Sequence, residues 1–88
     1  MKTLEMVAKQ NIVEKLAMYT RMSKRVVRNV KYENLTNEYA DAKRKEYESG
    51  FIGYIQAHRE IGLIDNDEFH NYEIKLFLMT DEVFGNRY

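Results

Sequence analysis

The sequence of 88 residues contains no proline and only four glycines. Proline breaks helices because it lacks a backbone N–H and clashes with the preceding turn, and glycine weakens them. Little in this chain therefore forces the backbone to change direction, which favours long helices. Hydrophobic residues make up 44% of the chain, enough for a folded core, and the length fits one domain over residues 1–88.

Apolar residues recur at helical spacing in three segments, which predicts helices over about residues 3–31, 36–61 and 66–84. Each helix has an apolar face that must pack on another element. The predicted fold is all-α, a small bundle or extended antiparallel hairpin of three helices, completed by dimerisation. The inner face of the first helix is expected to contain Ala8, Ile12, Leu16, Tyr19, Met22, Val26, Val27 and Val30.

Short polar side chains mark the expected helix starts. Thr3 is predicted to cap the first helix, and Asn34 and Thr36 are both candidates for the second. Asp65 and Glu68 have the spacing of a capping box, in which each side chain accepts a hydrogen bond from the other residue's backbone N–H. The third helix is therefore expected to begin directly after Asp65.

Two glycines lie beside the apolar stripe of the second helix. Gly50 and Gly53 each cost about 1 kcal/mol relative to alanine in a helix interior. Their presence indicates either the close approach of a neighbouring helix or a kink near Ser49 and Gly50.

The turn between the second and third helices reads Glu60-Ile61-Gly62-Leu63-Ile64-Asp65-Asn66-Asp67-Glu68-Phe69. A glycine, an apolar pair, a cap and then Glu-Phe join the two helices. This arrangement resembles the helical hairpin of the SHOCT (short C-terminal domain) family. The resemblance implies two helices joined by a short turn and carries no activity with it.

Charge is unevenly distributed along the chain, although 14 basic and 14 acidic residues balance overall. The stretch from Lys15 to Tyr32 has six basic residues and no carboxylate. At 100° per residue, five of them fall opposite the apolar face of the first helix, with Val13 and Ala17 among them. These five residues, called the basic face, are Arg21, Lys24, Arg25, Arg28 and Lys31. They are predicted to bind an anionic partner, unless acidic residues of the third helix already neutralise them.

An alternative interpretation turns segment 15–32 into a helix-turn-helix that binds DNA. Ala17, Ser23 and Val27 resemble that motif in their spacing, with Ser23 capping the recognition helix. The motif requires a break near residues 20–22, where Arg21 replaces the usual glycine of the turn. A continuous amphipathic helix explains the same residues without a break.

The third helix carries a second apolar set that points away from its inner face of Phe69, Tyr72, Leu76, Met79 and Val83. Exposed apolar patches usually mark interfaces, so a homo-oligomer is expected. The candidate self-association residues are Ile74, Phe77, Leu78 and Phe84.

Signatures of catalysis and of cofactor binding are missing from the sequence. There is no cysteine for a thiolate nucleophile or a metal site, and His58 and His70 lack the spacing of a metal-binding pair. No glycine-rich phosphate loop, signal peptide or membrane-spanning run occurs. We expect no enzyme activity, no cofactor and no membrane contact, and a cytoplasmic location.

The predicted function is that of a small non-catalytic regulatory protein that binds a macromolecule. A protein partner is expected, and nucleic acid is the alternative partner. Small chains without cysteine and proline are typical of phages and mobile elements, where they often inhibit a larger protein.

Overall fold

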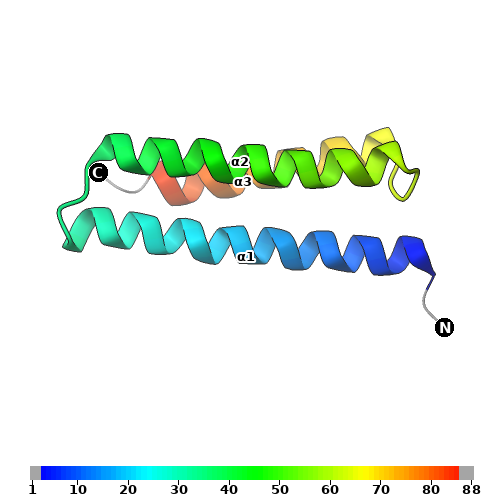
Figure 1. Ribbon diagram of the computed structural model, residues 1–88, viewed down its shortest axis with the longest axis horizontal. Coiled ribbons are helices and arrows are strands. Elements are labelled where there is room, and N and C mark those ends of the chain that lie inside the picture. The colour runs from blue at the N-terminus through cyan, green and yellow to red at the C-terminus, as the bar shows by residue number, and fades with distance from the viewer. Residues whose placement is uncertain (1–2, 86–88) are drawn as a thin grey trace.

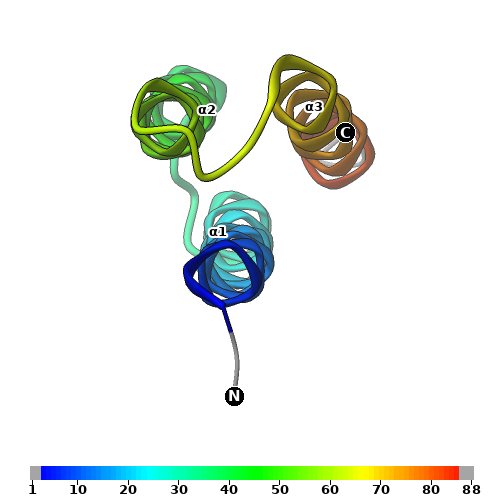
Figure 2. The ribbon, with the colours of Figure 1, turned by 90° about the vertical axis from the view of Figure 1, so that its right-hand side faces the viewer.

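The structure, a computed structural model, describes residues 3–85 and contains three helices. They are α1 (Leu4–Tyr32), α2 (Asn37–Glu60) and α3 (Asn66–Gly85). The helices run up, down and up along an elongated bundle of 47 × 23 × 16 Å (Figure 1). Seen from the end, they form a triangle in which each helix contacts the other two (Figure 2). The prediction of a small all-α bundle is confirmed.

Local capping chemistry fixes where α1 and α2 begin. The Thr3 hydroxyl accepts a hydrogen bond from the Met6 N–H at 3.1 Å, as expected. Thr36 does the same for α2, accepting from the Tyr39 N–H at 3.1 Å. Asn34, the other candidate cap, instead adopts a left-handed conformation with φ of 57°, which asparagine tolerates better than most residues. Thr36 is therefore the cap of α2.

The predicted capping box is present at the start of α3. The Glu68 N–H donates to the Asp65 carboxylate at 2.8 Å, and the Asp65 N–H donates to the Glu68 carboxylate at 3.1 Å. Lys9 on α1 also forms an ion pair with Glu68, at 2.5 Å. The hydrogen bond from Lys9, followed by that from the Asp65 backbone, lowers the pKa of Glu68. This contact links the first turn of α3 to α1.

The core consists of two clusters stacked along the bundle axis. Tyr19 packs against both clusters, with its ring centre 5.6 Å from that of Tyr47 and 6.3 Å from that of Phe51. The first cluster contains the buried residues Ile12, Phe51, Ile55, Ile64, Phe69 and Leu76. The second contains Val26, Ala40, Tyr47 and Phe84.

The two glycines of α2 have different surroundings, and the helix passes both without a break. A Cβ atom at Gly50 would lie 2.5 Å from the Tyr19 hydroxyl, so the predicted close approach of a neighbouring helix is correct there. A Cβ atom at Gly53 would meet nothing within 4 Å. Close packing therefore explains Gly50 and does not explain Gly53.

This difference predicts that Gly53→Ala raises the free energy of unfolding by about 0.5–1 kcal/mol, because alanine restricts the unfolded chain and favours the helix. Gly50→Ala should gain less or lose stability, because its methyl group displaces Tyr19. Urea unfolding of both variants checks the prediction. Equal effects at the two positions would contradict the contact between Gly50 and Tyr19.

Two hydroxyl groups are fully buried between the helices, and only one of them has a partner. Thr80 on α3 lies with its Oγ1 2.7 Å from a carboxylate oxygen of Glu48 on α2. Ser23 on α1 is equally buried, and its hydroxyl has no hydrogen-bond partner among the described residues. A buried hydroxyl without a partner is destabilising.

We expect Ser23→Ala to stabilise the protein by about 1 kcal/mol, since it removes the unpartnered hydroxyl and favours the helix. Thr80→Val is the matched control: it removes a hydroxyl that has a partner and should lower stability. Chemical denaturation measures both effects. Loss of stability in Ser23→Ala would mean that the Ser23 hydroxyl is hydrogen-bonded after all.

Candidate interaction surface

The five residues of the basic face lie together on the outer side of α1, and all five are exposed. Arg21 and Arg28 are two turns apart and lie opposite the buried face that contains Ser23 and Val26. Arg25 lies towards α2, close enough to counteract the rise that burial causes in the Tyr47 pKa. Lys24 lies towards α3 and lines a groove with residues of that helix. The surface therefore extends across the full outer width of α1.

Among residues 3–85, no carboxylate of the acidic half forms an ion pair with the basic face. Some of these carboxylates pair elsewhere: Glu68 with Lys9, and Asp81 with Arg44. Glu48 also pairs with Arg44, at 3.4 Å. None of the ion pairs within residues 3–85 includes a cation of the basic face. Its positive charge is therefore presented to solvent.

The outer side of α1 carries apolar side chains in its first half, with the exposed Gln10 between them. Met6 and Val13 are 55% and 56% exposed, and Ala17 is exposed one turn further along. These residues continue into the basic face through Arg21 and Lys24, because steps of four and seven residues stay on one side of a helix. Val13 and Ala17, which interrupt the predicted basic stripe, thus form its apolar extension.

A shallow groove of about 210 Å³ separates the basic face from α3. Val27 and Val83 form its apolar lining, and Lys24 and Glu82 provide one charge of each sign. Such a groove can accept one apolar side chain whose neighbours are polar.

The helix-turn-helix interpretation is wrong about the geometry of segment 15–32. α1 is one helix from Leu4 to Tyr32, with no turn near Arg21. The Thr20 hydroxyl donates to the Leu16 carbonyl at 2.8 Å, which satisfies it within the helix. Ser23 is not a cap, because it lies buried in mid-helix. The interior of the bundle requires one unbroken apolar face along α1, which a turn would interrupt.

The second apolar set on α3 is only partly where the sequence placed it. Ile74 is 56% exposed, Phe77 38% and Leu78 65%. Phe84 is completely buried, so its assignment to a self-association surface is wrong. Its ring packs in the second core cluster, and the Arg44 guanidinium lies 5.9 Å from the ring centre.

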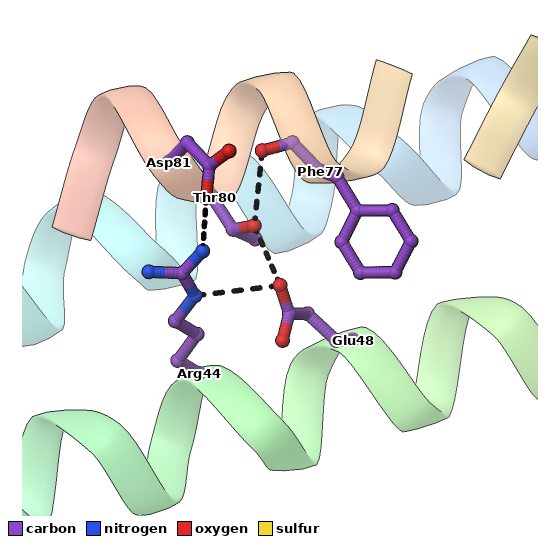
Figure 3. A network of polar contacts seen from close by, with 5 residues as sticks. All are labelled: Arg44, Glu48, Phe77, Thr80 and Asp81. Atoms are coloured by element: carbon purple, nitrogen blue, oxygen red, sulfur yellow. Dashed lines mark hydrogen bonds and ion pairs between the residues drawn. The ribbon is translucent and has the colours of Figure 1, made fainter. Parts of the chain in front are cut away.

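A polar network that no sequence pattern indicated joins α2 to the end of α3 (Figure 3). Arg44 contacts the carboxylates of Glu48 on its own helix and Asp81 on α3. Thr80 donates to Glu48 at 2.7 Å, and its hydroxyl also lies 3.3 Å from the Phe77 carbonyl. The charges and the Thr80 hydroxyl in this network pair with one another, so the network holds α2 and α3 together.

Neither histidine lies in a metal site. His58 is half-buried, and its Nδ1 lies 2.7 Å from the Tyr54 carbonyl oxygen. Over residues 3–85, no three side chains of His, Asp or Glu come together in a group that could hold a metal ion. In the same part of the chain, no helix is both long and apolar enough to cross a membrane.

Comparisons with known proteins give no information on the function of this chain. No protein-family model matches the chain, and neither a curated protein nor a solved structure does. The likeness of the Glu60–Phe69 turn to SHOCT hairpins is therefore a likeness of a turn alone.

Proposed function

We propose that this protein is a non-catalytic regulatory protein that binds an acidic, amphipathic surface of a partner protein. The outer side of α1 is the binding surface. The observation that carries the proposal is that five exposed cations, none of them in an ion pair within residues 3–85, continue the side of α1 on which Met6 and Val13 are exposed. The protein would regulate its partner by binding alone, because the bound three-helix bundle blocks the partner surface that it covers.

Two features favour a protein partner over nucleic acid. The chain has no net charge, whereas domains that bind nucleic acid are usually strongly basic. The outer side of α1 also exposes Met6 and Val13, and a phosphate backbone offers nothing apolar for these side chains to contact. A partner helix with an acidic end and an apolar end matches both the basic face and these apolar side chains.

Each part of the surface has a distinct role in this proposal. Arg21 and Arg28 can form bidentate hydrogen bonds with carboxylates, which gives orientation. Met6 and Val13 supply apolar area that leaves water on binding. The groove beside Val27 can accept one apolar side chain and so fix the register. Charge attraction raises the association rate, and the apolar contacts slow dissociation.

The proposal can be tested with designed helical peptides that carry an acidic half and an apolar half along one face. Fluorescence anisotropy would measure their binding, and that of labelled duplex and single-stranded DNA, from low to physiological salt. We expect the peptide to bind and its affinity to fall with salt. Arg21→Glu/Arg28→Glu should abolish binding, and Val13→Ser should weaken it at every salt concentration.

Lys45→Glu, compared with Arg28→Glu, is the matched control, because Lys45 is exposed on α2, forms no ion pair within residues 3–85 and undergoes the same charge change, so binding should stay intact. Circular dichroism should show equal helix content in all variants. Tighter binding to DNA than to any acidic peptide, lost in the α1 variant and kept in the α2 control, would replace the protein partner with nucleic acid. Equal losses in both variants would show that only overall charge matters.

A further inference from the structure

We propose that the exposed face of α3 binds the same face of a second copy of this chain, with the two helices antiparallel. The centre of this face is the pair Ile74 and Leu78, which are 56% and 65% exposed and one turn apart. Phe77 borders the pair with a ring that is 38% exposed. In the bundle, no helix covers these three side chains.

A second copy fits this face because the face is complementary to itself in one orientation. A two-fold axis near residue 76 places Ile74 of one copy against Leu78 of the other, and the contact is repeated across the axis. Heptad spacing supports such a seam, because residues 71, 74, 78, 81 and 85 follow one another at steps of three and four. Asn71 then lies opposite Asp81 of the second copy, where an amide can donate to a carboxylate.

Charges beside the seam fix the orientation. Lys75 and Glu82 are both exposed, and they lie two turns apart on the same side of α3. Lys75 is the one lysine of α3, which has no arginine. In the antiparallel pair, Lys75 of each copy leans towards Glu82 of the other, since side chains point towards the start of their own helix. In a parallel pair, the edges that carry Lys75 and Glu82 in the two copies would lie on opposite sides of the seam, so these charges could not pair.

Among the described residues, neither charge is committed to an ion pair. The ammonium group of Lys75 lies 5.6 Å from the ring centre of Tyr72, and Glu82 lines the groove beside Lys24. No ion pair within residues 3–85 includes either of them. Both are therefore able to pair with the second copy.

The size of the face predicts a weak dimer. Stable interfaces bury about 800 Å² on each partner, and three partly exposed side chains provide well below that area. We expect a dissociation constant on the order of 100 µM. α1 and α3 stand at different corners of the triangle of helices (Figure 2), and the side chains at the centre of the dimer face, Ile74 and Leu78, belong to α3 alone. The inference does not depend on the proposed function.

Analytical ultracentrifugation from roughly 10 µM to 1 mM tests the inference. The unmodified chain should show a monomer–dimer equilibrium. Lys75→Glu and Glu82→Lys should each weaken the dimer at least about tenfold, because like charges then face each other. The double variant Lys75→Glu/Glu82→Lys exchanges the two charges and should restore the dimer. Lys45→Glu on α2 should have no effect.

A monomer at every concentration would overturn the inference. So would a dimer that both single charge reversals leave unchanged, because another surface would then hold it. Failure of the double variant to restore the dimer would overturn the antiparallel pairing. Lys75 and Glu82 are exposed, so these changes should leave the helix content and the unfolding midpoint close to those of the unmodified chain.

Discussion

Replacing Phe84 by alanine is expected to lower the free energy of unfolding by about 3–5 kcal/mol. The Phe84 ring is completely buried and closes the second core cluster against Val26, Ala40 and Tyr47. Removing it leaves a cavity in addition to the loss of buried apolar area. A chain of this length has a total stability of roughly 4–13 kcal/mol, so this loss is a large part of it. Urea unfolding followed by circular dichroism measures the change.

Leu78→Ala is the matched control, since Leu78 is 65% exposed on the same helix. It should change stability by less than about 1 kcal/mol and should weaken the proposed dimer. The opposite pattern would contradict the position of Phe84. If Phe84→Ala left stability unchanged and abolished self-association, the ring would lie on the surface as the sequence analysis expected.

The misplacement of Phe84 has a geometric cause. The apolar periodicity of α3 predicts an inner face that is one stripe around Leu76, which suits a helix with a single neighbour. In the bundle, α3 packs on both α1 and α2, so its buried arc is wider. Thr80 and Phe84 fall on the added part of that arc, facing α2. How many neighbours a helix has depends on the assembled fold and not on its own periodicity.

Helix starts were more predictable because their chemistry is local. Thr3 and its hydrogen-bond donor are three residues apart, and so are Asp65 and Glu68. A pattern that involves a few neighbouring residues can be found without knowledge of the fold. Whether Asn34 or Thr36 caps α2 was harder to predict. Both have suitable side chains, and only the path of the loop decides which one lies at the start of the helix.

Long-range contacts could not be predicted from sequence patterns. Arg44 and Asp81 are 37 residues apart, and only the packing of α2 on α3 brings them together. The same limit applies to the basic face. Amphipathicity placed its residues on the outside of α1, but whether the acidic residues of α3 would neutralise them depended on packing. The structure commits Asp81 to Arg44 and Glu68 to Lys9 instead.

Arg21→Pro is expected to destabilise the protein by about 3 kcal/mol or more, because α1 is continuous through this position. Proline removes the hydrogen bond from the residue 21 N–H to the Ala17 carbonyl, and its ring clashes with that carbonyl. The resulting kink would also misalign the two core clusters, which Tyr19 joins two residues earlier. Thermal and urea unfolding would both show the loss.

Arg21→Ala separates this backbone effect from the loss of the charge. Because Arg21 is exposed and makes no ion pair within residues 3–85, the alanine variant should keep its stability to within about 0.5 kcal/mol. It should still weaken the binding of acidic peptides. A proline variant as stable as the alanine variant would mean that the chain turns near Arg21. The basic face would then be divided between two helices, and a partner could no longer bind to it as one straight surface.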